Sequence, residues 1–270
     1  MKRLAVVPFL ILALAACQTP QPATLHSPSS TRTREADDMV MVYVPSGTFQ
    51  MGSDTGVSNE KPVHEVTLDS FWIDQTEVTN ARYARCVNDG GCSAPPGSSS
   101  YTRNSYYGDS QYADYPVIYV SWDDAFKYCA WAGAELPTEA QWEYAARGSD
   151  GYIYPWGDES PSEQLLNYNS NVGDTSAVGS YPAGASWVGA LDMAGNVWEW
   201  VGDWYGTYPS ESQVNPTGPT TGDSHVLRGG SWGISELGVR AAHRSYSTPD
   251  VRDQAFGAVG FRCVSAVPGE

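Results

Sequence analysis

The sequence predicts an α+β domain with little regular secondary structure. Two short segments carry clear helix signals, and strand-like alternation of apolar residues is confined to short runs. From residue 149 onward the chain is rich in glycine and tryptophan and has few long periodic segments; the whole chain holds 27 Gly and 10 Trp in 270 residues. This composition suits short strands joined by long pinned loops, with aromatic side chains supplying the burial that regular elements do not. It favours neither a helix bundle nor a doubly wound sheet.

The chain opens with features of a bacterial lipoprotein signal peptide, residues 1–16. Two basic residues precede an apolar stretch that is too short for a permanent membrane-spanning helix. The stretch ends in Leu-Ala-Ala-Cys, which resembles a lipobox and predicts lipidation of Cys17. The alternative is an ordinary signal peptide with a coincidental cysteine. Gln18, rather than Asp, favours sorting to the outer membrane, so we expect a cell-envelope lipoprotein facing the periplasm or the exterior.

We expect residues 17–38 to be the lipidated cysteine followed by a flexible tether, because they are mostly polar and have little to bury. Residues 39–270 predict one globular domain. The formal net charge is −16, and loss of Lys2 and Arg3 with the signal would make it −18. Nucleic acid is therefore not an expected partner. The acidic excess favours solubility, or in part the binding of cations.

Several elements can be placed along the domain. The run MVYVPSGTFQMGS alternates around a Pro-Ser-Gly turn and predicts a hairpin, and HEVTLDSFWID is a second strand-like run. Thr79 predicts the cap of a short helix that extends through Val87. Ser121 and Thr138 each begin a helix with a capping-box partner three residues later, and a glycine ends each one. Residues 93–115 predict an ordered surface loop.

Four further cysteines predict disulfides, because an exported chain meets an oxidising compartment. They are Cys86, Cys92, Cys129 and Cys263. Four cysteines allow three pairings. A local bridge between the first two, across a turn-rich loop, would leave the other two to pair.

The run LDMAGNVWEW, residues 191–200, is the strongest candidate for a binding site. Asp192 and Glu199 are hard carboxylate ligands, and the main-chain carbonyls of Gly195 and Val197 can point the same way. Mixed carboxylate and carbonyl oxygens suit calcium. The alternative is that the two carboxylates only cap backbone amides.

A second oxygen-rich run offers Asn167, the Tyr168 carbonyl and Asp174. Such residues are also what turns are made of, so the run alone does not predict a site. Catalytic patterns are weaker still. The four histidines have no metal-ligand spacing, and neither a serine-nucleophile turn nor a phosphate-binding glycine loop occurs. Four arginines near the C-terminus predict buried ion pairs rather than an anion site.

The motifs together resemble the formylglycine-generating enzyme (sulfatase-modifying factor) family. They occur in family order: GTFQMGS, EVTNARYARC, PVIYVSWDDAFKYCAWAGAELPTEAQWEYAARG, YPWGD, GSYPAGASWVGALDMAGNVWEWVGDWY, VLRGGSW and VGFRC. The resemblance covers about residues 40–265. It implies a C-type-lectin-like α+β fold, two calcium sites at the two oxygen-rich runs, and a disulfide between Cys129 and Cys263.

The resemblance also implies that the family's copper and thiol chemistry is absent. The first catalytic cysteine aligns with Ile234 and the second falls near Gly238 or Val239, and no cysteine occurs between residues 130 and 262. Neither copper nor iron is therefore expected. The chain also lacks the extra domain and histidines of the family's iron-dependent sulfoxide synthases.

The favoured hypothesis is a lipid-anchored, calcium-stabilised binding or structural module of the envelope, with a peptide, glycan or envelope protein as its partner. Its groove would use Trp232, Ser235, Glu236 and His243, beside residues 93–115. One alternative is a periplasmic oxidoreductase or maturation enzyme that uses Glu236, His243 or tyrosines as acid and base. Another is a hypervariable lectin-like display protein, which shares the fold.

Overall fold

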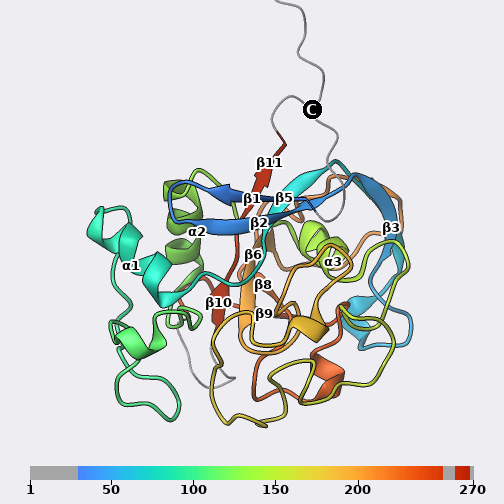
Figure 1. Ribbon diagram of the computed structural model, residues 1–270. Coiled ribbons are helices and arrows are strands. Elements are labelled where there is room, and N and C mark those ends of the chain that lie inside the picture. Colours follow the sequence, from blue (N-terminus) through green and yellow to red (C-terminus); the bar gives the residue numbers. More distant parts are fainter. Residues whose placement is uncertain (1–29, 252–258, 268–270) are drawn as a thin grey trace, which may run out of the picture.

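The computed structural model describes residues 30–251 and 259–267 (Figure 1). The expected signal peptide, Cys17 and residues 18–29 of the expected tether lie outside the described residues. No helix in the described part of the chain combines the length and the hydrophobicity needed to span a membrane.

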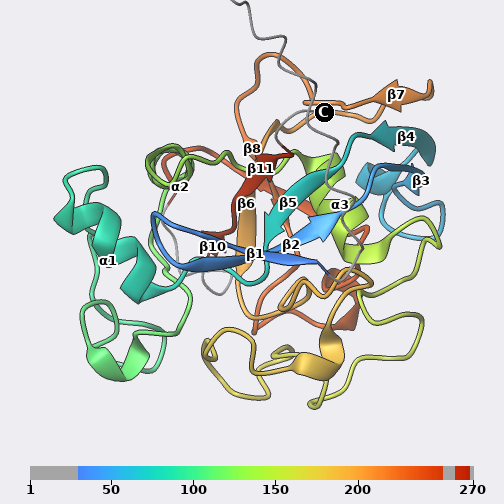
Figure 2. The ribbon, with the colours of Figure 1, turned by 45° about the horizontal axis from the view of Figure 1, so that its top comes forward.

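The first sheet is antiparallel and joins the two ends of the domain. Its strands lie in the order β1-β2-β5-β11. They are β1 (Thr31–Arg34), β2 (Met39–Val44), β5 (Phe71–Asp74) and β11 (Val264–Ala266). Val42 pairs with Ile73, which pairs with Val264 on its other side. The described C-terminal strand therefore lies beside residues from the start of the domain, as Figures 1 and 2 show.

The predicted tether extended too far, because residues 31–38 belong to the folded domain. Strand β1 pairs with β2 over its whole length. Arg34 is only 8% exposed and forms ion pairs of 2.7 Å with both Asp37 and Asp74. The polar composition was misleading because these charged groups are satisfied by one another rather than by water.

The predicted hairpin is also wrong, although both of its strands exist. Strand β2 pairs with β5, whereas β3 (Gly47–Met51) pairs with β4 (His64–Leu68) in another sheet. A Cβ atom added at Gly47 would lie 2.2 Å from the Tyr144 hydroxyl. The chain after the turn therefore packs tightly on a helix instead of folding back on β2. The short strand β7 (Gln213–Val214) completes this three-stranded sheet.

The third sheet carries the loops of the candidate site. It has the order β10-β6-β8-β9. Its strands are β10 (Val259–Phe261), β6 (Trp198–Trp204), β8 (His225–Arg228) and β9 (Arg244–Ser247). The pair β10 and β6 is parallel, and the other pairs are antiparallel. Trp200, at the centre of β6, is fully buried and its indole donates to the Val120 carbonyl at 3.0 Å.

Three helices begin where the sequence predicts. They are α1 (Asn80–Asn88), α2 (Trp122–Trp131) and α3 (Glu139–Arg147). Thr79, Ser121 and Thr138 are their N-caps, and the two predicted capping boxes are present. In both views α1 and α2 lie on one side of β6 and α3 lies on the other (Figures 1 and 2).

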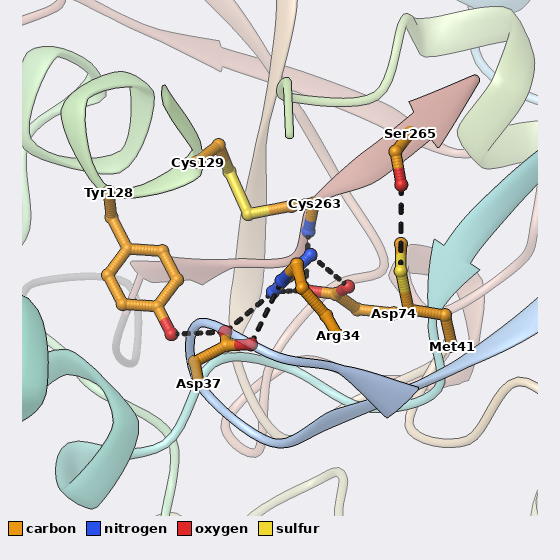
Figure 3. The surroundings of a disulfide bond; sticks show 8 residues. All are labelled: Arg34, Asp37, Met41, Asp74, Tyr128, Cys129, Cys263 and Ser265. Carbon is orange, nitrogen blue, oxygen red and sulfur yellow. Dashed lines mark hydrogen bonds and ion pairs between the residues drawn. A yellow bond between two sulfur atoms is a disulfide. The ribbon is translucent and has the colours of Figure 1, made fainter. Parts of the chain in front are cut away.

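Both disulfides that the sequence favoured are present, Cys86–Cys92 and Cys129–Cys263. The second bridge joins α2 to the chain between β10 and β11. Figure 3 shows it beside the Arg34 ion pairs, where Tyr128 of α2 donates to Asp37 at 2.6 Å. Covalent and ionic links thus hold α2 against the first sheet.

Candidate functional site

The loop between β8 and β9, residues 229–243, is where the sequence places the lost catalytic cysteines. Gly229 and Gly230 open it with left-handed backbone. A Cβ atom at Gly230 would lie 2.7 Å from the Gly238 carbonyl oxygen, so the loop closes tightly on itself. Hydrogen bonds from residues 169–170 hold the loop in place. The amide of Asn169 donates to the Ile234 carbonyl at 2.9 Å, and the amide of Ser170 donates to the Trp232 carbonyl at 2.7 Å.

The two positions that align with the family's cysteines touch each other. A Cβ atom at Gly238 would lie 2.4 Å from Cγ2 of Ile234. The isoleucine side chain therefore fills the space that a second side chain would need. Val239, the alternative second position, is fully buried in a cluster with Tyr154 and Leu166. Apolar side chains therefore fill this part of the loop, at the positions where the resemblance predicts that two thiols have been lost.

A half-buried histidine, His243, and a buried carboxylate, Glu60, lie close to Gly238. Nε2 of His243 would be 3.8 Å from a Cβ at Gly238, and its Nδ1 lies 3.4 Å from Oε1 of Glu60. Arg240 donates to both oxygens of Glu60. Burial alone would raise the pKa of Glu60, but the contacts with His243 and Arg240 outweigh it and hold that pKa at about 2.

The expected groove residues are only partly brought together. Ser235 and Glu236 are exposed, His243 is half-buried and Trp232 is buried. The Trp232 ring contacts Tyr101, with 5.1 Å between ring centroids, and Tyr101 is 67% exposed. Tyr101 belongs to the 93–115 segment, so this segment does border the site.

Sequence reasoning missed an apolar cleft that is lined in part by Leu237 and Arg240 of the loop. It has a volume of about 410 Å³. Val57, Ile153 and Leu237 line it and are 47%, 45% and 67% exposed. Three large apolar side chains exposed at one cleft are unusual on a free surface. Of these three residues, only Leu237 could have been noticed in the sequence, because it is an apolar residue that follows the polar Ser235 and Glu236 in the loop. We call this cleft, lined by Val57, Ile153 and Leu237, the apolar cleft.

The first expected calcium loop is buried and highly charged. Asp192 and Glu199 are 7% and 0% exposed. Glu199 receives hydrogen bonds on both oxygens from Arg262 and one from the Trp142 indole. Asp192 accepts from the Gly179 amide at 2.6 Å. Glu199 is therefore already heavily engaged by protein donors.

Glu77 joins this loop, and the sequence did not reveal it. It is fully buried, its Oε1 accepts from Asn196 at 2.9 Å, and its Oε2 has no hydrogen-bond partner. Burial, and next the negative charge of Asp192, raise the pKa of Glu77 well above its usual range. An unpartnered buried acceptor beside other carboxylates fits the cation that the sequence leads us to expect at this loop.

The residues of the second expected calcium site, Asn167, Tyr168 and Asp174, have different surroundings in the structure. Asp174 accepts from Ser100 and Thr102 and pairs with Arg103, so protein donors surround it. Asn167 donates to the Asp174 carbonyl, while its buried Oδ1 has no hydrogen-bond partner. The carbonyl oxygen of Tyr168, the ligand atom expected there, accepts from the Asn171 amide at 2.9 Å. Only the amide oxygen of Asn167 is a buried acceptor left open by the protein.

The four C-terminal arginines form buried ion pairs, as predicted. Their carboxylate partners are Glu139 and Glu143 for Arg228, Glu60 for Arg240, Glu139 for Arg244 and Glu199 for Arg262. In the described part of the chain, no three His, Cys, Asp or Glu side chains are grouped so as to hold a metal by themselves. A calcium ion here would depend on carbonyl and amide oxygens as well.

Known proteins share this architecture over almost the whole domain. Residues 26–267 match the family described as "Sulfatase-modifying factor enzyme 1-like domain". The formylglycine-generating enzyme of Streptomyces coelicolor is 37% identical over 308 residues, covering 93% of this chain and 96% of that enzyme. The serine/threonine-protein kinase pkn1 of Chlamydia caviae is 38% identical over 245 residues, covering 84% of this chain but 38% of the kinase. The chain thus spans less than half the length of that relative.

A solved structure gives the same fold. PvdO from Pseudomonas aeruginosa superposes with a TM-score of 0.70 at 26% identity, over 89% of this chain and 99% of PvdO. The predicted fold class, α+β and C-type-lectin-like with little regular secondary structure, is confirmed.

Proposed function

The chain belongs to the Sulfatase-modifying factor enzyme 1-like domain family, and from that premise we propose that it is a binding module that has lost the family's copper and thiol chemistry. The observation that carries the proposal is the contact between Ile234 and Gly238, where isoleucine fills the space of the lost thiol pair. The four cysteines of the described residues are all in disulfides. A thiolate that could bind copper or attack a substrate has no source at this loop.

The binding surface is the 229–243 loop together with its two flanks. Leu237 of the loop lines the apolar cleft, and Trp232 of the loop forms an aromatic pair with Tyr101. Exposed apolar side chains around a cleft suit the apolar side chains of a peptide or of a protein partner. Of the peptide, glycan and envelope-protein partners considered from sequence, this surface favours a peptide segment of another envelope protein.

Lipid anchoring at Cys17 and calcium binding complete the proposal. The lipobox-like residues before Cys17 support an anchor in the outer membrane. The unpartnered buried oxygens of Glu77 and Asn167 support two cation sites. When bound, calcium would neutralise buried carboxylates and hold the loops of the domain together.

A pair of matched surface variants tests the binding role. Leu237 and Val214 are both highly exposed apolar residues, at 67% and 71%, but only Leu237 lines the apolar cleft. In pull-downs from detergent-solubilised envelopes with the full lipidated chain, Leu237→Asp should reduce the recovery of specific partners at least tenfold. Val214→Asp should leave the recovery unchanged. Equal recovery with both variants would refute binding at this cleft.

A second candidate function is an enzyme with different chemistry on the same scaffold. It is favoured by His243, which lies behind position 238 and next to Glu60, where a proton could be exchanged with a bound substrate. Metal analysis and oxygen uptake distinguish the two candidates. Stoichiometric copper or iron, or oxygen consumption with a peptide that His243→Gln abolishes, would establish the enzyme. Calcium alone, without oxygen uptake, is expected for the binding module.

A further inference from the structure

The apolar cleft combines exposed apolar side chains with two cations. Arg147 and Arg240 line it together with Val57, Ile153 and Leu237. None of the described residues that line it is acidic, although the chain holds 31 Asp and Glu against 15 Lys and Arg. Its volume of about 410 Å³ suits a small ligand or the end of a peptide chain.

Arg147 shares its carboxylate partner with a second arginine. Its Nη1 lies 3.1 Å from Oε1 of Glu143, whose other oxygen accepts from Arg228 at 2.6 Å. Arg228 also reaches Glu139, but Glu139 is itself paired with Arg244 at 2.6 Å. Three guanidinium groups therefore share two glutamates, and one positive charge is left beside the cleft.

Asp203 does not restore the balance of charge. It accepts from the Glu139 amide at 2.7 Å, and it does not line the apolar cleft. Burial, and next the negative charge of Glu139, raise the pKa of Asp203 to about 7, so it carries only part of a negative charge at neutral pH.

Both arginines of the cleft keep N–H groups that the described residues do not use. A guanidinium has five N–H groups. Arg240 donates three of them, to one carbonyl and to both oxygens of Glu60. Arg147 also donates three, to two carbonyls and to Glu143. The side chains of Arg147 and Arg240 are 11% and 13% exposed, so a ligand in the cleft can reach them.

The apolar and cationic groups are held next to each other. Leu237 and Arg240 lie in the same loop, and Nε of Arg240 donates to the Leu237 carbonyl at 2.9 Å. A ligand must therefore present an apolar group and a negative charge close together. An apolar residue at the end of a peptide does so, because its side chain and its terminal carboxylate share one Cα atom. An internal segment carries these two groups on different residues.

We propose that the apolar cleft captures the C-terminal residue of a partner peptide, with an apolar side chain against its three apolar residues and the terminal carboxylate at Arg147 and Arg240. This rests on the binding function proposed above and names the class of its ligand. Charge complementarity supports it, since the carboxylate supplies the negative charge that the two arginines share too little of.

The test measures the fluorescence anisotropy of labelled peptides with the full chain in detergent. The probes are three N-terminally labelled pentapeptides, Ser-Gly-Ala-Ala followed by Leu, Val or Phe. At least one should bind with a Kd below about 1 mM. Its C-terminal amide should bind about tenfold more weakly or worse, because it lacks the charge. Since only the peptide changes, this loss cannot come from unfolding of the protein.

Variants of the protein locate the bound peptide. Leu237→Ala should weaken binding of the acid peptide about threefold or more, because it removes apolar contact area. Val214→Ala changes a residue that is equally exposed but lies outside the cleft, and should have no effect. Arg147→Gln should lower the preference for acid over amide about threefold or more. This variant should still fold, because Glu143 keeps Arg228 as its partner.

Equal binding of the acid and amide forms, or no binding of any of the three acids, would overturn the inference. An amidated peptide that ends in Leu-Glu tests the other source of a carboxylate. If it binds as tightly as the acids, the ligand is an acidic side chain and the proposal is wrong.

The outcomes also separate this inference from the binding function on which it rests. If Leu237→Asp loses its envelope partners while acid and amide peptides bind equally, the binding role stands and only the C-terminal ligand is wrong. If Leu237→Asp keeps its partners and no peptide binds, both proposals fail.

Discussion

At the scale of single residues, the candidate site is defined by the close contact between Ile234 and Gly238. The backbone of Gly238 is not left-handed, so the overlap of a Cβ with the Ile234 side chain is what disfavours a side chain there. The sequence made it possible to place both positions in one loop. It could not reveal their contact, which depends on the closure of the loop over Gly230.

This contact predicts coupling between positions 234 and 238. Gly238→Ala should destabilise the domain by about 1–3 kcal/mol, because the new methyl group overlaps with the isoleucine side chain. In the Ile234→Ala background the same change should cost little. Urea denaturation of the four proteins gives the coupling energy, expected to be about 1 kcal/mol or more. Additive effects would mean that the two positions do not touch in solution.

Asp203 predicts a pH dependence of stability. Burial, and next the negative charge of Glu139, raise the pKa of Asp203 to about 7. The unfolded chain releases this proton near pH 4. Asp203 therefore contributes most favourably to stability below about pH 4, and this contribution is lost as the pH rises through about 7.

The variant Asp203→Asn cannot titrate but can still accept from the Glu139 amide, the bond that Asp203 makes at 2.7 Å. Its free energy of unfolding, measured in urea between pH 4 and 8, should fall less steeply with pH than that of the native chain. The exposed Asp54→Asn is a control with the same change of charge. Native and Asp203→Asn curves that run parallel would contradict the assignment.

At the scale of elements, local signals were reliable and long-range ones were not. The starts of the three helices were predictable because each cap bonds within its own first turn. The partners of β2 and β3 were not, since strand pairing depends on residues far away in the chain. Strand β1 was missed because its charged residues looked solvated, while Arg34 is in fact buried between two carboxylates.

Strand β1 should be essential to the fold despite its polar sequence. Arg34→Met leaves Asp37 and Asp74 buried without their guanidinium and should cost about 3–5 kcal/mol. Arg32, in the same strand, instead donates to the Ser265 hydroxyl and stacks on Trp72. Arg32→Met should cost about 1 kcal/mol or less. Denaturant unfolding compares the two variants, and equal losses would show that the ion pairs contribute nothing specific.

At the scale of the whole molecule, sequence motifs gave the fold class but not the functional surface. The motifs recur in family order, so the overall architecture follows from them. The apolar cleft is built from Val57, Ile153 and Leu237, which lie in three separate loops. No local pattern indicates that these side chains meet. The same holds for Glu77, which contacts Asn196 of the 191–200 loop although the two residues are 119 positions apart in the chain.

The two disulfides should contribute unequally to global stability, because they close loops of very different length. Cys129–Cys263 spans 134 residues and Cys86–Cys92 spans 6. Loop-closure entropy alone assigns them roughly 5 and 2 kcal/mol. The double variant Cys129→Ala/Cys263→Ala should therefore lose about 2–3 kcal/mol more than Cys86→Ala/Cys92→Ala in urea denaturation. Both changes remove two sulfur atoms, but Cys92 is only partly buried while the other three cysteines are fully buried, so lost packing adds slightly to the cost of removing the longer bridge. Equal losses would mean that β11 and α2 stay associated in the unfolded chain without the bridge.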